Sequence, residues 1–176
     1  MNNSFLSVVN IIQYSYQIRL INAYLKNIYP ILKANFSDFE ILLVNNSAQN
    51  FDDIIQALPA EIKQHIFLLQ LSSTINSNNA IIAGLDRSNG DYTVIFEFDF
   101  IEQPELIVEL FEKTQEGHDI VYLQAKERVS KGISTLFYKF FYFIFKRYSN
   151  VAIDEKAHHT RIISRRALNS ILRLRE

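Results

Sequence analysis

The feature that most constrains the fold is an alternation of short apolar runs with segments whose apolar residues recur at helical spacing. The first run, FLSVVNIIQY at residues 5–14, is continuous and rich in β-branched residues, which is typical of a buried strand. It is followed by Ile18, Ile21, Leu25 and Ile28, which would share one face of a helix. The chain is therefore expected to begin with a strand and then a helix.

The same alternation continues through the next hundred residues. Further strands are predicted at residues 38–47, 66–71, 92–98 and 119–124, and helices at 51–58, 76–88 and 104–115. Strands that alternate with helices form successive right-handed β-α-β units, whose sheet is mainly parallel and covered on both faces. The expected fold class is therefore α/β.

The pattern changes after residue 130. An aromatic helix is predicted at 132–148, then a polar stretch, then a final helix for which Ser164 is a suitable N-cap. His158 and His159, in the polar stretch, are expected to be exposed loop residues, since two histidines alone seldom form a zinc site. No linker, repeat or low-complexity segment interrupts the sequence, which predicts one domain over residues 1–176.

Composition excludes several functional classes. The formal net charge is -1, so no overall basic field would attract nucleic acid, which is not expected as a partner. The sequence has no cysteine, which excludes disulfides and thiolate zinc sites and is consistent with a cytoplasmic location. The N-terminus lacks a basic region and a cleavage site, so it is interpreted as a strand and not a signal peptide.

Two carboxylates stand out in the stretch FEFDFIEQPE. Glu97 and Asp99 are two positions apart, so an extended chain would place them on one side and Phe96, Phe98 and Phe100 on the other. They fall at or just past the carboxyl end of a predicted strand, which is where ligands bind in open α/β sheets. This pattern predicts a ligand site at Glu97 and Asp99, and a solvated strand end without function is the alternative.

Several segments, taken in order, resemble family 2 glycosyltransferases of the GT-A fold. The segments that carry the resemblance are EILLVNNS, AIIAGLDRSNGDY, VIFEFDFIEQPEL, DIVYLQAKER and HHTRIISRRAL. Among these enzymes the chain is most similar to polyprenyl-phosphate sugar transferases of the dolichyl-phosphate mannose synthase type. The resemblance implies a Rossmann-like, three-layer GT-A domain with a mostly parallel sheet. It also implies inverting transfer of a sugar from a nucleotide diphosphate-sugar to an acceptor, either a lipid-linked phosphate or a glycan, in surface polysaccharide or glycolipid synthesis.

The resemblance also implies residue roles. Asp99 corresponds to the metal-binding acid of the family's Asp-x-Asp motif and Glu97 to its helper, with Mg²⁺ or Mn²⁺ as the cofactor. Such a cation would neutralise the charge that builds on the departing diphosphate. Asn45 and Asn46 stand where the family has nucleotide-recognising aspartates. His159 stands where the family has an acid, and it is the candidate general base for a hydroxyl acceptor, whereas a phosphate acceptor needs no base.

The sequence departs from the family at several of these positions. Asn45 and Asn46 supply no charge and are equally suited to a turn. Ile101 replaces a metal-binding Gln, and an alkyl chain cannot coordinate a cation. Two hypotheses therefore stay open: a working glycosyltransferase with an unusual site, and a catalytically impaired protein of the same fold that serves as a binding or assembly module.

The aromatic segment 136–145, LFYKFFYFIF, is apolar on almost every face. It is shorter than the roughly 20 residues that span a membrane, so it predicts a peripheral contact at the inner face of the membrane. A homodimer interface, or packing of the helix on the sheet, is the alternative. Arg128, together with Lys126 and Lys131, is a candidate for binding an acceptor phosphate, and a solvated basic loop is the alternative. By resemblance, Arg161 is a second candidate.

Overall fold

The computed structural model describes residues 2–124 and 157–174. The chain divides into two compact units, of which the first comprises Met1–Tyr122 together with His159–Glu176, and the second is Leu123–His158. Nearly all described residues belong to the first unit, and the fold and the site below are those of this unit.

Three of the sequence predictions lie outside the described residues. They are the aromatic helix at 132–148, the membrane or dimer contact at 136–145, and the acceptor role of Arg128. These stay predictions, as does the single domain over residues 1–176. Within the part of the chain that is described, no helix has the length and apolar character needed to cross a bilayer.

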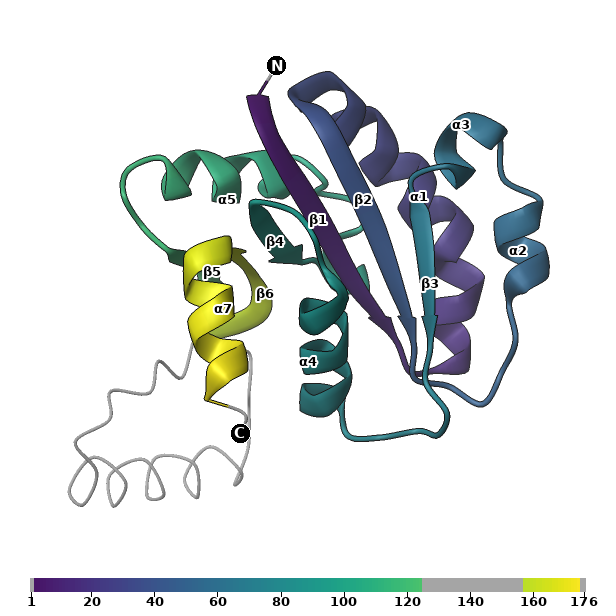
Figure 1. The fold of residues 1–176 in the computed structure, drawn as a ribbon. Coiled ribbons are helices and arrows are strands. Elements are labelled where there is room, and N and C mark those ends of the chain that lie inside the picture. The colour runs from purple at the N-terminus through teal and green to yellow at the C-terminus, as the bar shows by residue number, and fades with distance from the viewer. Residues whose placement is uncertain (1, 125–156, 175–176) are drawn as a thin grey trace, which may run out of the picture. The chain divides into compact units, whose positions relative to one another are not determined.

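Six described strands form one sheet in the order β3-β2-β1-β4-β6-β5 (Figure 1). β1 pairs in parallel with β2 and β4, and β2 pairs in parallel with β3, whereas β6 is antiparallel to β4. The expectation of an α/β fold with a mostly parallel sheet is therefore confirmed. The strands are β1 Asn2–Ile12, β2 Phe36–Asn45, β3 Ile66–Gln70, β4 Tyr92–Ile95, β5 Ile120–Gln124 and β6 Ala157–Ser164.

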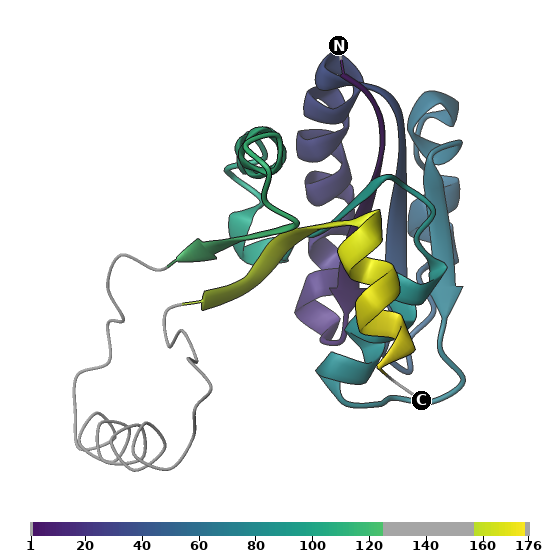
Figure 2. The same cartoon turned by 60° about the vertical axis from the view of Figure 1, so that its left-hand side comes forward.

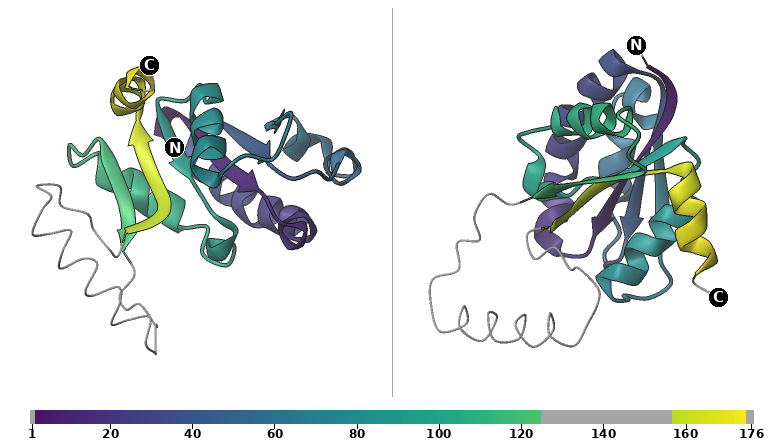
Figure 3. Two further views of the ribbon diagram at one scale, coloured as in Figure 1. Left: turned by 90° about the horizontal axis from the view of Figure 1, so that it is seen from below. Right: turned by 90° about the vertical axis from the view of Figure 1, so that its left-hand side faces the viewer.

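Helices cover both faces of this sheet. Seen along its edge, α1 and α5 lie on one face and α4 and α7 on the other, which is the expected three-layer arrangement (Figure 3). The helical elements are α1 Ser15–Asn35, α2 Asp52–Gln56, α3 Ala60–Lys63, α4 Ser77–Arg87, η1 Phe98–Phe100, α5 Leu106–Thr114 and α7 Arg165–Arg173.

The core has a different character on each face of the sheet. On the face covered by α1 and α5, aromatic rings meet: Phe111 of α5 packs edge-on against Phe36 and Tyr92, with ring centroids 5.0 and 5.2 Å apart. On the opposite face the contacts are aliphatic, and Val44 of β2 packs with Ala80 of α4. Both faces bury apolar surface, which explains the nearly unbroken apolar strands in the sequence.

The sequence-predicted ends of several helices are confirmed. The side chain of Asn76 accepts a hydrogen bond from Asn79 N at 2.9 Å and caps α4. Ser164 caps α7 by accepting from Ala167 N at 3.3 Å. Gly117 follows α5 with a φ of 96°, a conformation that favours glycine.

Strand β6 was not predicted. The sequence indicated a polar stretch here, but Ala157–Ser164 pairs with β4, and Figure 2 shows β5 and β6 side by side beyond it. His158 and His159 therefore lie on a strand, and their expected placement in a loop was wrong. The signal was weak because the buried positions Thr160, Ile162 and Ile163 are mixed with polar neighbours.

Candidate functional site

A pocket of about 260 Å³ lies at the carboxyl ends of β1 and β4. The carboxyl ends of β1, β2 and β3 and the start of α4 all lie at this edge of the sheet, at the bottom of Figure 1. The pocket brings together Glu97, Asp99 and His159, three of the residues predicted from the sequence. It is lined by Val9, Asn10, Ile11, Gln13, Tyr14, Tyr16, Gln17, Ser77, Ile81, Ile95, Phe96, Glu97, Phe98, Asp99 and His159.

The two acids reach this pocket from a tight turn and not from an extended strand. β4 ends at Ile95, and Phe98–Phe100 form a single turn of 3-10 helix. The prediction that Glu97 and Asp99 share one face of a strand was therefore wrong, whereas their position just past the strand end is confirmed. The turn buries the ring of Phe98 and leaves Asp99 exposed, because each residue advances the chain around a helix axis.

The floor of the pocket includes a buried polar group that the sequence analysis assigned no role. Asn10 is 1% exposed and donates from Nδ2 to Phe96 O at 2.6 Å. Its Oδ1 is buried and accepts no hydrogen bond from any group in the described ranges. Leaving a buried acceptor without a hydrogen bond costs free energy, whereas the bond from Nδ2 to Phe96 O stabilises the turn that follows β4.

Asn45 and Asn46 do not line the pocket. Asn45 donates to Gln49 O at 2.8 Å and to Gln70 Oε1 at 2.7 Å, and it accepts from Ser47 N at 3.0 Å. Asn46 exchanges two hydrogen bonds with the backbone of Ile75. Both side chains form hydrogen bonds within the loops that follow β2 and β3, as expected for residues that stabilise a turn. Their role in binding a nucleotide stays a prediction.

His159 and Arg161 stand two positions apart on β6. His159 is exposed and lines the pocket, while Arg161 is half-buried and does not line it. Arg161 Nε donates to His159 O at 3.1 Å. Between them Thr160 is buried, and its Oγ1 accepts from Glu97 N at 3.3 Å, which links β6 to the acid-bearing turn. Thr160 was not predicted, because the strand that carries it was not predicted.

The junction of β1 and α1 supplies the mouth of the pocket. Gln17 Oε1 accepts from Gln13 N at 2.8 Å and from Tyr14 N at 2.9 Å, which fixes a tight entry into α1. Tyr14 and Tyr16 are each 54% exposed, and their rings are nearly parallel with centroids 5.8 Å apart. Ser77 Oγ at the start of α4 donates to Gln13 Oε1 at 2.5 Å, which links α4 to the junction of β1 and α1.

The donor set fits a hard divalent cation only if the substrate completes it. The described residues contain no group of three or more His, Asp or Glu side chains that could hold a metal ion by themselves. Glu97 and Asp99 offer carboxylate oxygens, and Mg²⁺ is commonly held by one or two carboxylates together with substrate phosphates and water. The pocket therefore suits a cation that arrives with a diphosphate.

Comparison with known proteins identifies the family. The model of glycosyl transferase family 2 matches residues 19–172. An undecaprenyl-phosphate 4-deoxy-4-formamido-L-arabinose transferase of Shewanella sediminis is 27% identical over 139 residues, which cover 78% of this chain and 42% of the relative. A bactoprenol glucosyl transferase of Shigella phage SfV is 28% identical over 141 residues, which cover 79% of this chain and 46% of the relative.

A solved structure supports the same fold. Glucosyl-3-phosphoglycerate synthase from Mycobacterium tuberculosis, in complex with Mn²⁺, uridine diphosphate and glucosyl-3-phosphoglycerate, superposes with a TM-score of 0.62 at 14% identity. The match covers 93% of this chain and 57% of that one. The chain spans about half the length of the curated relatives that it matches. Because the family model matches most of its residues, this protein belongs to glycosyl transferase family 2, and it has the GT-A fold of that family's enzymes.

Proposed function

We propose that this protein transfers a sugar from a nucleoside diphosphate-sugar to an acceptor, with inversion at the anomeric carbon. The observation that carries the proposal is the meeting of Glu97, Asp99 and His159 around one pocket at the carboxyl ends of β1 and β4. These residues come from segments some 60 positions apart in the sequence, and a strand-end pocket is the common ligand site of open α/β sheets.

Asp99 and Glu97 would hold the donor's diphosphate through Mg²⁺ or Mn²⁺, with Asp99 as the metal ligand and Glu97 as its helper. The cation supplies Lewis-acid neutralisation of the charge on the leaving diphosphate. The exposed carboxylate of Asp99 is open to such a complex, while Glu97 is half-buried beside the pocket floor. The metal-bound structural neighbour supports the choice of cation.

His159 is proposed as the general base for a hydroxyl acceptor. It lines the pocket from β6, on the wall formed by a strand antiparallel to β4. In its neutral form the imidazole would take the proton of the attacking hydroxyl as the bond to the anomeric carbon forms. A phosphate acceptor is already ionised, and His159 would then be dispensable.

A lipid-linked phosphate is the acceptor class that we propose. Its support comes from the names of two relatives, an undecaprenyl-phosphate sugar transferase and a bactoprenol glucosyl transferase. Comparing His159→Ala with the wild type on a polyprenyl phosphate and on a hydroxyl-bearing glycan would discriminate the acceptors. Loss of turnover only with the glycan assigns His159 as a base for hydroxyl acceptors.

The donor site is tested by calorimetric titration of uridine, guanosine and thymidine diphosphates with and without Mn²⁺. We expect binding that requires Mn²⁺ in the wild type and is abolished in Asp99→Ala. Asp52→Ala is the matched control, because Asp52 is an exposed carboxylate on α2 that does not line this pocket. If the folded wild type binds none of the diphosphates, the enzyme proposal fails and the binding or assembly module becomes the better reading.

Peripheral membrane contact through residues 136–145 is a separate part of the proposal. Flotation of the whole protein with liposomes of neutral and of anionic lipid tests it. Flotation with either would support the contact. A protein that stays at the bottom of the gradient and sediments as a dimer would favour the interface alternative.

A further inference from the structure

The turn that carries the two acids is fastened by side chains of α1 and β1. Within this acidic turn, residues 96–101, Phe100 N donates to Glu97 O at 3.2 Å, and Ile101 N donates to Phe98 O at 3.1 Å. A 3-10 turn of this length is a weakly bonded element. Its conformation therefore depends on contacts from outside.

The first fastening is at the beginning of the acidic turn. The carbonyl of Phe96 accepts two hydrogen bonds, from Tyr24 Oη at 2.8 Å and from Asn10 Nδ2 at 2.6 Å. Tyr24 is fully buried, and so are Asn10 and Phe96 to within 1%. Two donors on one carbonyl fix the orientation of the peptide that leads directly into Glu97.

The second fastening is at the end of the acidic turn. Asn27, one helical turn beyond Tyr24 on α1, donates from Nδ2 to Ile101 O at 3.0 Å. Residues three apart on a helix lie on one face, so Tyr24 and Asn27 reach the two ends of the same turn. The span between the two fastened carbonyls contains both Glu97 and Asp99.

Ring packing adds to these bonds. The ring of Tyr24 packs against Phe98 with centroids 4.9 Å apart and against Phe96 at 6.2 Å. Phe98 separates the two acids in the sequence, and it is 4% exposed. The packing of Phe98 under α1 therefore favours the outward direction of its neighbour Asp99.

We propose that Asn10, Tyr24 and Asn27 are positioning residues that hold the acidic turn in its cation-binding conformation. The inference rests on the function proposed above, since it assigns a task to residues that support the same pocket, of which Asn10 also lines it. Neither Tyr24 nor Asn27 lines the pocket, so they act through the turn and not by touching a ligand. Carboxylate ligands lose metal affinity when the groups behind them no longer fix their geometry.

The hydrogen bonds from Asn10, Tyr24 and Asn27 to the acidic turn are called the clamp below. Hydrogen exchange followed by mass spectrometry or NMR tests the clamp without any ligand. Asn27→Ala and Tyr24→Phe each remove one donor, and Tyr24→Phe keeps the ring that packs on Phe98. We expect the amides of Phe100 and Ile101 to exchange about fivefold faster or more in each variant, because an intramolecular hydrogen bond that holds the turn is lost.

Matched controls lie on the same helix. Asn35 is half-buried like Asn27 but donates to Ile31 O at 2.8 Å, inside α1 itself. Tyr29 is 7% exposed and packs against Phe39, away from the acidic turn. Asn35→Ala and Tyr29→Phe should leave the exchange of the acidic turn at the wild-type rate. Unchanged exchange in Asn27→Ala and Tyr24→Phe, or an increase spread equally over β1 and β2, would overturn the clamp.

Binding of Mn²⁺ in the presence of uridine diphosphate, measured by electron paramagnetic resonance, gives the functional readout. We expect roughly tenfold weaker Mn²⁺ binding in Asn27→Ala and Tyr24→Phe than in their controls. Faster local exchange with unchanged Mn²⁺ affinity would show a structural clamp only and overturn the positioning role. If the wild type itself binds no Mn²⁺, the donor-site proposal fails, and the exchange data still decide whether the clamp exists.

Discussion

Asn46 and Ile75 exchange two hydrogen bonds across 29 residues: Asn46 Nδ2 donates to Ile75 O, and Ile75 N donates to Asn46 Oδ1, both at 2.8 Å. The amide thus acts like a short piece of paired strand, which ties the loop after β2 to the segment that enters α4. An aspartate could accept the bond from Ile75 N but could not donate to Ile75 O. These two bonds therefore explain why position 46 has an amide and not a carboxylate.

The first prediction follows from this pair. Asn46→Asp, which introduces the residue type that the resemblance implies for this position, should lower the free energy of unfolding by about 1–3 kcal/mol, because the half-buried Ile75 carbonyl loses its donor and faces a carboxylate. Urea denaturation measures the change. Asn22→Asp, at an exposed position of α1, is the control. Equal stability of Asn46→Asp and the wild type would contradict the structural role.

The fold was largely predictable because its strands and helices differ in hydrophobic period. Unbroken apolar runs marked β1 and β2, and cap residues such as Asn76 and Ser164 marked helix starts. β6 was not predicted because polar residues interrupt its apolar run. The predicted end of β4 lay beyond its actual end at Ile95, because Phe96 and Phe98 are also apolar. Buried aromatic residues are typical of strands, so in a sequence they predict a strand even where, as here, they pack beneath a turn.

The candidate site was predictable only in part. Glu97, Asp99 and His159 meet at the pocket as the sequence order suggested. Asn10 and Tyr24 could not be found in this way, because their task depends on the carbonyl of Phe96, which lies 86 and 72 positions away, respectively. Hydrogen bonds to backbone atoms leave no pattern in the identity of the accepting residue.

The second prediction concerns the close packing of α4 on the sheet. A Cβ atom at Gly84 would lie 2.6 Å from Val9 Cγ1 and 2.9 Å from Val44 Cγ2. Gly84→Ala should therefore destabilise the protein by about 1–3 kcal/mol through overpacking. Helix propensity alone would give the opposite sign, a gain of up to about 1 kcal/mol. Thermal or urea unfolding decides between the two signs.

Asp86→Ala is the control for the Gly84 prediction, because Asp86 is exposed on the same helix. Its effect should stay within about 0.5 kcal/mol. A Gly84→Ala variant that is more stable than the wild type would show that α4 can move away from β1 and β2 at little cost.

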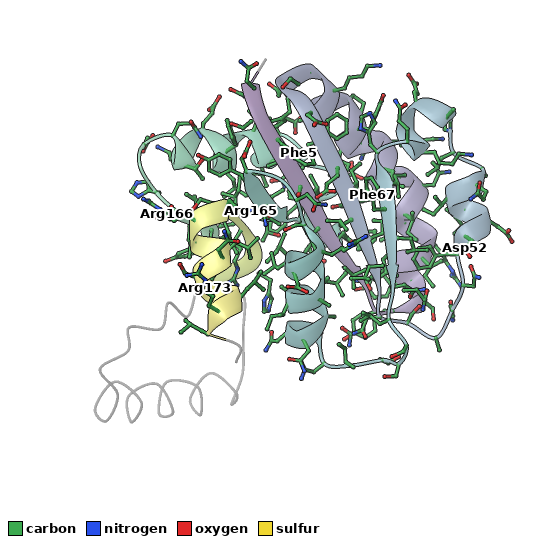
Figure 4. All side chains as sticks on the ribbon, in the orientation of Figure 1. Phe5, Asp52, Phe67, Arg165, Arg166 and Arg173 are labelled. Carbon is green, nitrogen blue, oxygen red and sulfur yellow. The ribbon has the colours of Figure 1, made fainter. Side chains whose placement is uncertain are left out.

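The third prediction concerns acid pH and the start of α7, where Arg165 and Arg166 are labelled in Figure 4. Arg166 Nη2 and Ser164 Oγ each donate to the carboxylate of Asp119 at 2.6 Å. These hydrogen bonds, with Arg166 first, hold the pKa of Asp119 below its usual value of 3.8. A lowered folded-state pKa contributes stability above 3.8, which is lost as the pH falls through the folded-state value.

Asp119→Asn should therefore lower the melting temperature at neutral pH by a small amount, since Arg166 is 81% exposed and solvent screens the pair. The gap between variant and wild type should close as the pH falls below 3.8. Differential scanning calorimetry over this pH range measures it, with Asp38→Asn as an exposed control. A gap that is independent of pH would assign the effect to lost packing and not to the charge of Asp119.

The last prediction concerns alkaline pH and Tyr24. Burial raises the pKa of the Tyr24 phenol well above its ordinary value of 10.0, and nearby Glu97 raises it further, against the hydrogen bond from Asn10. The folded protein therefore keeps this proton while the unfolded chain releases it. The stability is fully present below pH 10.0 and declines as the pH rises above this value, by up to about 1.4 kcal/mol per pH unit.

Tyr24→Phe should be less stable than the wild type at neutral pH and should lose less stability above pH 10.0, because it has no phenolic proton to release. Urea unfolding at a series of alkaline pH values measures both slopes, with Tyr16→Phe, which changes a half-exposed ring, as the control. Parallel slopes for the wild type and Tyr24→Phe would show that the phenol ionises in the folded state, and hence that the contact with the Phe96 carbonyl opens before the protein unfolds.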